Sequence, residues 1–195
     1  RPELILAGDW MPIRIFSFQK EKLTPLADIP ESEGWWNCIK IADIDRNGTP
    51  DIIAGNFGLN SNIKADSSHP ARLFTADFDQ NGQTECIPVF YKPDGKAYPY
   101  YLKDEMESQL PALKKKFLQY KDYAGKPIEA IFSSEQLNKA TVLSVTETRS
   151  SIFYNLGNGK FQKQPLPVAA QLSPVFGIAV EDCNADGKPD LQLGG

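Results

Sequence analysis

The sequence predicts a mainly β fold made of repeated strand–turn–strand units, and three observations lead to that prediction. The 195 residues include 15 Pro, 14 Gly and 11% aromatic residues, a composition that favours turns and strands over helices. Short apolar or β-branched runs bounded by turn residues recur along the chain, as is typical of strands. An oxygen-rich turn lies between two such runs at residues 43–51 and recurs at residues 77–85 and 182–190.

The strands follow from apolar runs that end at Gly, Pro, Asn or Asp. In chain order they are predicted at residues 4–7, 12–18, 22–26, 38–42, 51–55, 72–76, 86–91, 96–101, 141–147, 151–154, 160–166, 176–180 and 191–193. A turn at Gly8 and Asp9 separates the first two. The polar segment 56–70 is predicted to be a long surface loop, where binding residues often lie.

The middle of the chain departs from this pattern. Apolar residues at helical spacing predict an amphipathic stripe, formed by Leu102, Met106, Leu110, Leu113 and Phe117, with the lysines at 114–116 in solvent. Pro111 predicts two short helices that meet near Leu110, and residues 128–132 and 135–139 predict two more helical turns. The second oxygen-rich turn starts 34 residues after the first and the third starts 105 residues after the second, which indicates a helical insertion at 102–140.

The three turns carry the donor atoms that a hard cation requires. Ca²⁺ takes about 6–8 oxygen ligands, several of them charged. Counted from the first Asp of each turn, carboxylates or amides stand at positions 1, 3, 5 and 9, a glycine at position 6 allows a sharp bend, and the carbonyl of position 7 is a further donor. The predicted calcium ligands are Asp43, Asp45, Asn47, Thr49 and Asp51 in the first loop, Asp77, Asp79, Asn81, Gln83 and Glu85 in the second, and Asp182, Asn184, Asp186, Lys188 and Asp190 in the third.

Two other interpretations of these turns are an EF-hand loop and a plain hairpin turn. An EF-hand needs a bidentate Glu at position 12 and flanking helices, but position 12 is Ala54, Pro88 or Leu193 and the flanks are predicted strands. The other alternative is an ordinary Asp/Asn/Gly hairpin turn that binds nothing. It has most weight for the second loop, where Glu85 replaces the shorter Asp at position 9.

The pattern D-x-[DN]-x-[DN]-G-x-x-[DE] between apolar strands resembles the FG-GAP (VCBS) repeats of integrin-α-type β-propellers. Residues 8–16, 34–37 and 54–61 further resemble the propeller part of bacterial ASPIC/UnbV-type proteins. The resemblance extends over nearly all of residues 1–195. It implies a partial β-propeller of about three four-stranded blades with a small helical insertion, stabilised by Ca²⁺. It also implies that this chain is part of a longer protein, and that sheet faces left exposed would promote self-association.

The sequence favours a binding or scaffold module over an enzyme. The net charge of −4 disfavours nucleic acid and anionic membranes as partners, and no apolar run is long enough to span a bilayer. The single histidine, His69, lies in a polar loop and is predicted to be a surface residue, and no catalytic residue is predicted.

We expect a protein or glycan as partner and an extracytoplasmic location, where weak calcium sites suffice. The alternative is the propeller domain of a polysaccharide lyase or hydrolase.

Cysteines and aromatic residues complete the predictions. Cys38, Cys86 and Cys183 have no metal-ligand spacing and do not suggest a disulfide framework, and the first two are predicted to be buried thiols on strands. The aromatic residues that could form a contact surface are Trp10, Trp35, Trp36, Tyr91, Tyr98, Tyr100 and Tyr101. Packing inside the fold is favoured for Trp35 and Trp36, because they directly precede a strand.

Overall fold

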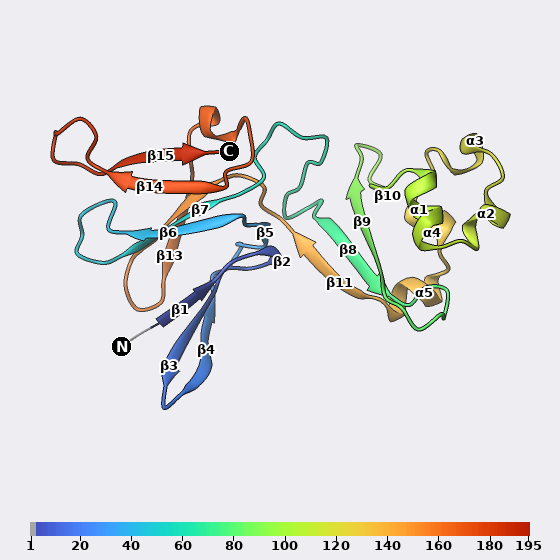
Figure 1. The fold of residues 1–195 in the computed structure, drawn as a ribbon, viewed down its shortest axis with the longest axis horizontal. Helices are drawn as coiled ribbons and strands as arrows, with labels where there is room; N and C mark the ends of the chain where they lie inside the picture. Colours follow the sequence, from blue (N-terminus) through green and yellow to red (C-terminus); the bar gives the residue numbers. More distant parts are fainter. Residues whose placement is uncertain (1–2) are drawn as a thin grey trace. The chain divides into compact units, whose positions relative to one another are not determined.

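A computed structural model describes residues 3–195 and divides the chain into two compact units (Figure 1). The first unit is formed by Arg1–Asn62 and Val145–Gly195, and the second by Ile63–Ser144. Strands account for 38% of the residues and helices for 15%, so the predicted mainly β class is confirmed. Several antiparallel sheets form, and none of the sheets within residues 3–195 closes on itself.

The first unit contains most of the strands. They are β1 (Glu3–Leu6), β2 (Asp9–Met11), β3 (Arg14–Gln19), β4 (Lys22–Asp28), β5 (Gly34–Trp35), β6 (Cys38–Ala42), β7 (Asp51–Gly55), β12 (Ser151–Asn155), β13 (Phe161–Pro165), β14 (Gly177–Glu181) and β15 (Asp190–Gly194), with a short 3₁₀ helix η1 (Val168–Gln171). The central sheet has the order β13-β12-β7-β6, and it is accompanied by the sheets β1-β3-β4 and β14-β15 and by the small pair β2-β5.

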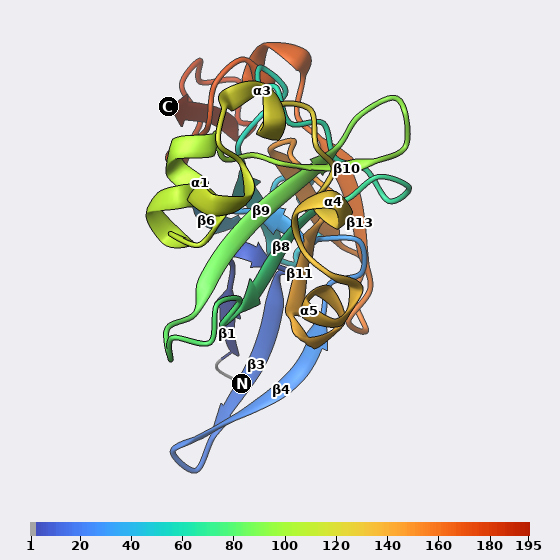
Figure 2. The same ribbon diagram turned by 90° about the vertical axis from the view of Figure 1, so that its right-hand side faces the viewer.

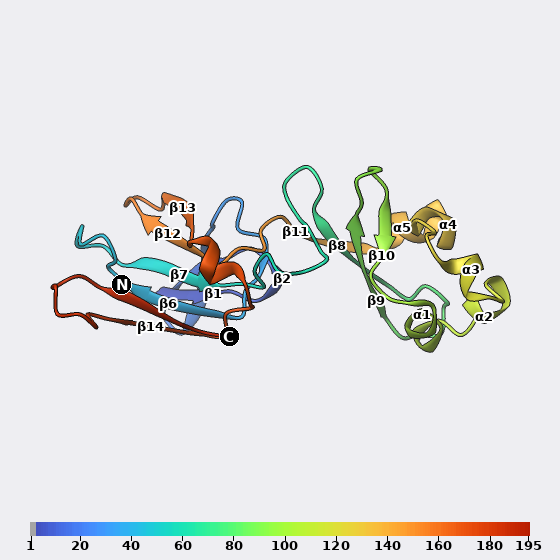
Figure 3. The ribbon, with the colours of Figure 1, turned by 90° about the horizontal axis from the view of Figure 1, so that it is seen from above.

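Strand β7 is buried on both faces, since every residue from Asp51 to Gly55 is buried. Successive side chains of a strand point to opposite faces. Ile52 therefore joins a cluster that includes Phe153 and residues of β1 and β3, whereas Ile53 joins Ile152 and residues of β14 and β15. The central sheet thus packs between its two neighbouring sheets (Figure 1), and the order of its own strands can be followed in Figure 3.

The second unit combines a sheet with five short helices (Figure 2). Its elements are β8 (Ala71–Ala76), β9 (Glu85–Tyr91), β10 (Ala97–Pro99), α1 (Lys103–Gln109), α2 (Leu113–Lys116), α3 (Tyr120–Tyr123), α4 (Ile128–Ile131), α5 (Ser134–Lys139) and β11 (Thr141–Val145). The sheet order is β10-β9-β8-β11. One face of this sheet, with Phe74, Ile87 and Val89, packs in a single cluster with helical residues such as Met106 and Ile128.

The structure confirms the predicted helices and most of the predicted strands. The break between α1 and α2 lies at Leu110 and Pro111, and Ser133 caps α5 through a 3.2 Å hydrogen bond from the N–H of Gln136. The predicted turn at Gly8 and Asp9 is only partly right, because Asp9 already begins β2, which pairs with β5. Helix α3, η1 and the β2-β5 pair have no periodic apolar pattern and were not predicted.

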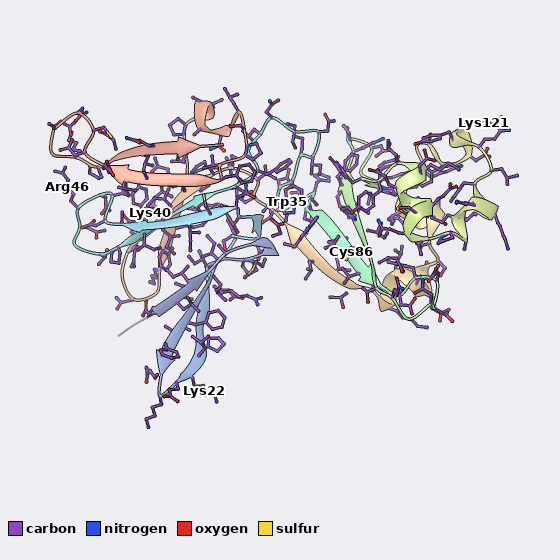
Figure 4. The ribbon with its side chains drawn as sticks, in the orientation of Figure 1. Lys22, Trp35, Lys40, Arg46, Cys86 and Lys121 are labelled. Atoms are coloured by element: carbon purple, nitrogen blue, oxygen red, sulfur yellow. The ribbon has the colours of Figure 1, made fainter. Side chains whose placement is uncertain are left out.

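Two predicted burial states are wrong. Leu102 is 61% exposed because it is the residue that precedes α1, whereas the other four residues of the stripe are buried. Cys86 is exposed, since it alternates with Glu85 and Ile87 and therefore lies on the face of β9 opposite the helices (Figure 4). Cys38 is half-buried, and burial raises the pKa of its thiol.

No helix within residues 3–195 is both long enough and apolar enough to cross a membrane.

A buried polar network joins the segment after β7 to the segment before β12. Asn56 is fully buried; its side-chain amide donates to the Glu147 carbonyl at 2.9 Å, and its N–H donates to Ser150 Oγ at 2.9 Å. Gln171 accepts from the N–H of Ser150 and donates to the carbonyl of the same residue. Each of these buried groups has a partner, so the network fixes the chain without an unsatisfied group.

The carboxylate of Glu147 lies at the edge of this network. It accepts two hydrogen bonds of 2.8 Å from the Arg149 guanidinium and lies 3.2 Å from Lys163 Nζ. Burial raises the pKa of Glu147, but the hydrogen bonds from Arg149 and the charges of Arg149 and Lys163 outweigh burial and hold the pKa below its ordinary value of 4.5.

The double-sided core predicts a large cost for truncating Phe153. This side chain is fully buried and packs edge-on against Trp36, with ring centroids 5.7 Å apart. We expect Phe153→Ala to lower the free energy of unfolding of the first unit by about 3–5 kcal/mol. Urea unfolding followed by tryptophan fluorescence measures it, because Trp10, Trp35 and Trp36 all lie in this unit. The matched control is Phe18→Ala, since Phe18 is 47% exposed. Equal losses for the two variants would contradict the packing.

Glu147 predicts a dependence of stability on pH. Its pKa is lower in the folded chain than in the unfolded chain, so its stabilisation is present above about pH 4.5 and disappears as the pH falls through the folded pKa. We expect Glu147→Gln to destabilise the first unit by about 2 kcal/mol near pH 7, with a smaller difference near pH 3. Asp28→Asn, which alters an exposed pair with Arg14, is the control and should change little. A loss from Glu147→Gln that is the same at both pH values would exclude an ionised Glu147 as its cause.

Candidate metal centres

The three oxygen-rich loops occupy the same place in three hairpins. Residues 43–51 join β6 to β7, residues 77–85 join β8 to β9, and residues 182–190 join β14 to β15. Position 9 is paired with the last residue of the preceding strand in every case, as Ala42↔Asp51, Ala76↔Glu85 and Glu181↔Asp190. The predicted strand flanks are confirmed, so these are not the helix-flanked loops of EF-hands.

The backbone of the three loops bends at the same two positions. Position 4 has a left-handed backbone, with φ of 61° at Arg46, 63° at Gln80 and 58° at Ala185. Position 6 is a glycine with φ of 86° in the first loop, 87° in the second and 77° in the third. The left-handed region is accessible to glycine without steric cost, which explains the glycine at position 6. Arg46 marks this bend at the tip of the first loop (Figure 4).

The carboxylate at position 1 organises each bend. In the first loop Asp43 accepts from the N–H of Asn47 at 3.1 Å and from the N–H of Gly48 at 2.9 Å. The same bonds are 3.0 and 2.8 Å long at Asp77, and 3.1 and 2.7 Å long at Asp182. Position 3 also accepts from the N–H of position 5 in each loop, at 3.1, 3.2 and 2.9 Å. The loops therefore share one hydrogen-bonding pattern as well as one spacing.

The carboxylate at position 9 ties the start of each loop to its end. Asp51 accepts from the N–H of Ile44 at 2.9 Å, Glu85 from that of Phe78 at 2.8 Å, and Asp190 from that of Cys183 at 3.0 Å. The longer side chain of Glu85 thus makes the same contact as the two aspartates. The length of Glu85, which favoured a plain turn at the second loop, does not change the geometry.

Two of the loops bring three carboxylates together. Asp43, Asp45 and Asp51 each offer an oxygen within 4.8 Å of the others, and Asp77, Asp79 and Glu85 do the same. Asp51 and Glu85 are buried and the other four carboxylates are exposed. Like charges at this separation repel one another. A cation held among these oxygens would remove the repulsion, so either cluster could hold a metal ion.

The third loop forms no such cluster among residues 3–195. Its position 3 is Asn184, where the other loops have Asp45 and Asp79. Its third carboxylate is Asp186 at position 5, which accepts from the N–H of Lys188 at 2.7 Å. The number of acidic residues is the same as in the other loops, but one of them is placed differently around the bend.

The remaining predicted ligands take part in the turns. Asn47 accepts from the N–H of Thr49 at 2.7 Å through Oδ1, which also accepts from the Thr49 hydroxyl. Asn81 accepts from the N–H of Gln83 at 2.7 Å in the same way. These contacts orient the amides and bring positions 5 and 7 together. A carbonyl oxygen has two lone pairs, so Asn81 Oδ1, which accepts one bond, has room for a further partner, whereas both lone pairs of Asn47 Oδ1 are used by Thr49.

Sequence reasoning missed the residues that support the loops from elsewhere in the chain. The N–H of Asn155 donates to Asp51 Oδ1 at 2.8 Å, and the Asn155 carbonyl accepts from the Thr49 hydroxyl at 3.0 Å. Gln136 of α5 donates to the carbonyl of Phe78 at 2.9 Å, beside a hollow of about 180 Å³ at the second loop. Asn155 follows Asp51 by 104 residues, so no local pattern indicates the contact.

The other residues singled out from the sequence lie outside these clusters. His69 is exposed as predicted, and its ring packs edge-on against Tyr91. Cys38, Cys86 and Cys183 are free thiols. Trp35 and Trp36 are buried, so the predicted packing role is confirmed, and Trp35 contacts Trp10 and Phe57 with ring centroids 5.0 and 5.4 Å apart.

Comparisons with protein-family models, with curated proteins and with solved structures found no match.

Asp51 provides a test of the loop geometry that needs no metal. Both of its carboxylate oxygens accept backbone hydrogen bonds in a fully buried position. Asp51→Asn replaces one acceptor by an NH₂ donor that faces an N–H, so we expect a loss of about 1–3 kcal/mol in the free energy of unfolding, measured in EDTA. Asp45→Asn, at an exposed position of the same loop, is the matched control and should cost less. A larger loss for Asp45→Asn would contradict this geometry.

Proposed function

We propose that this chain is a calcium-stabilised part of a β-propeller of the FG-GAP/VCBS type that acts as an extracytoplasmic binding or scaffold module. The observation that carries the proposal is the recurrence of one loop geometry in three hairpins, with three carboxylates converging in two of them. A single Asp/Asn/Gly turn would be ordinary. Three with the same bends, the same hydrogen bonds and the same register support an origin as repeats of one unit.

The order of strands in the first unit supports a propeller blade. The central sheet reads β6, β7, β12 and β13 both in space and along the chain, once Ile63–Ser144 is set aside. Four strands in consecutive order are the unit from which propellers are built. The loop lies between the first two strands of this sheet, and the loop between β14 and β15 has the same place in the next sheet. The packing of sheets on both faces of the central sheet agrees with stacked blades.

The chemistry of the donor atoms favours Ca²⁺ among the common metals. The clusters contain carboxylate oxygens and no imidazole or thiolate, which disfavours Zn²⁺. The one cysteine within the three loops is Cys183, at position 2 of the third loop. Its thiol sulfur accepts a hydrogen bond of 2.8 Å from the side-chain amide of Gln192. Mg²⁺ demands near-ideal octahedral geometry and retains several waters, whereas Ca²⁺ accepts the irregular arrangement of a short loop. Weak sites of this type fit an environment rich in calcium, which supports an extracytoplasmic location.

The partner we propose is a protein or a glycan that contacts the loops and aromatic side chains. Half-buried Trp10 adopts a left-handed backbone with φ of 59° and packs against Trp35. Such a backbone is unusual for a bulky residue and occurs more often at binding sites than elsewhere. Aromatic faces are suited to sugar rings and to apolar protein side chains.

Calcium should stabilise the folded protein. At about 5 mM Ca²⁺ and a Kd of about 10⁻⁴–10⁻³ M, each site contributes about 1–2 kcal/mol, which raises Tm by several degrees. Asp43→Ala removes the carboxylate that organises the first loop, and we expect it to reduce the rise in Tm. Asp9→Ala, an exposed aspartate outside the loops, is the control and should leave the rise unchanged. Differential scanning calorimetry in EDTA and in calcium measures the effect, and identical melting in the two conditions would exclude stabilisation by calcium.

Binding and catalysis are distinguished by a separate measurement. A glycan array and a polysaccharide degradation screen, each run in calcium and in EDTA, give opposite results for the two functions. Retention of an intact glycan supports the binding module. Calcium-dependent cleavage of a polysaccharide would contradict it.

A further inference from the structure

Residues 111–126 of the second unit form a basic tip that also carries exposed apolar side chains. The tip comprises α2, α3 and the segments next to them, and both helices lie at the end of this unit farthest from β11 (Figures 1 and 3). We propose that the basic tip binds the surface of an anionic lipid bilayer, with its lysines among the headgroups and Leu118 inserted between them. The inference goes beyond the proposed function and does not require bound calcium.

The charge of the basic tip is opposite to that of the whole chain. The chain has a net charge of −4, whereas residues 111–126 contain five lysines and one acidic residue, Asp122. Lys114, Lys115, Lys121 and Lys126 are exposed, and none of them pairs with an acidic side chain among residues 3–195. Lysines near an anionic bilayer are each attracted to it, and the attraction depends on local charge. The net charge of the chain, which disfavours such a partner, does not describe this tip.

The acidic side chains closest to these lysines in the chain and in the neighbouring helix α1 have other partners. Asp122 accepts from the N–H of the residue that precedes α3, at 3.0 Å. Glu105 of α1 accepts from the N–H of Leu102 at 2.8 Å, and Glu107 of α1 forms an ion pair with Lys103. These carboxylates cap helices or pair within α1, so the four exposed lysines of the tip remain available to a partner.

The apolar side chains of the tip are exposed because the fold holds them there. Leu118, between α2 and α3, is 79% exposed, more than any other large apolar side chain among residues 3–195, and Tyr120 is 46% exposed. On either side of them Phe117 and Tyr123 are buried, with their rings edge-on and centroids 5.6 Å apart. The Tyr123 hydroxyl donates to the Tyr101 carbonyl at 2.7 Å. The segment is thus anchored at both ends, and such preorganisation lowers the cost of inserting Leu118.

The residue types favour a lipid surface over an acidic polysaccharide. Residues 111–126 contain lysine but no arginine, whose planar guanidinium is the group suited to paired contacts with carboxylates. The long apolar stem of lysine lets its charge reach the headgroups while the stem lies against apolar surroundings. Burial among acyl chains stabilises an exposed leucine, and tyrosine is enriched at membrane interfaces. Leu118 and Tyr120 therefore match the boundary between headgroups and acyl chains.

Sedimentation with lipid vesicles tests the proposal on the chain of residues 1–195 in EDTA, which prevents calcium from bridging lipids and carboxylates. We expect binding to vesicles of phosphatidylcholine mixed with phosphatidylglycerol and none to vesicles of phosphatidylcholine alone. Raising the salt concentration should weaken the binding about tenfold or more, because salt screens the lysines. Equal binding to both kinds of vesicle, or binding to neither, would overturn the proposal.

Matched charge variants locate the contact on the molecule. The double variant Lys114→Glu, Lys115→Glu should weaken binding to anionic vesicles about tenfold or more. The control is Lys20→Glu, Lys22→Glu, which changes the net charge equally at two exposed lysines of the first unit and should have little effect. Equal losses for the two double variants would contradict a contact at the basic tip.

Leu118 separates insertion from attraction by charge alone. Leu118→Ser leaves the charge unchanged and should weaken binding about tenfold, because less apolar surface is buried among the acyl chains. Val168→Ser alters a side chain of the first unit that is 72% exposed, and it should not weaken binding. The substituted side chains are all exposed, so each variant should melt at the temperature of the unsubstituted chain. Equal binding by the two serine variants would overturn the insertion of Leu118.

An acidic polysaccharide provides the competing partner. Binding of the tip to polygalacturonate, lost in Lys114→Glu, Lys115→Glu and without binding to vesicles, would assign the tip to a glycan and overturn the lipid surface. A failure of calcium to stabilise the chain would bear on the proposed function alone, because every measurement on the tip is made in EDTA.

Discussion

The carboxylate of Asp51 connects the loop chemistry to the architecture of the first unit. One oxygen closes the first loop through the N–H of Ile44, and the other accepts from the N–H of Asn155 at the end of β12. A fully buried carboxylate is costly unless its lone pairs are satisfied, and here both oxygens are bonded. The same group is a member of a three-carboxylate cluster, so an ion held there would act on a residue that also fixes a strand.

Burial on both faces explains why β7 is the most deeply buried strand of this unit. Its five residues are enclosed because the central sheet has a sheet packed against each face. The β14–β15 hairpin has the same loop and the same register, yet its residues are exposed or half-buried. The contrast between two equivalent hairpins in one molecule shows how much of the burial of a strand comes from its neighbours and how little from its own sequence.

Local pattern predicted most elements, and its failures have physical reasons. Hairpin loops and helical stripes depend on neighbours in the sequence, which is why the loops and the α1–α2 break were predicted correctly. The pairing of β2 with β5 and the position of Asn155 depend on residues far along the chain. The predicted burial of Cys86 is wrong because a strand pattern alone does not say which face of the strand is covered.

The mainly β class, the three loops and the residue types at each of their positions follow from local sequence, because a sharp bend with oxygen donors needs glycine and acidic residues at fixed spacing. Two features became visible only in the folded chain: residues 63–144 interrupt one sheet between its second and third strands, and the third loop does not gather its carboxylates. Strand partners and carboxylate convergence are set by contacts between distant segments, and a spacing along the chain does not contain them.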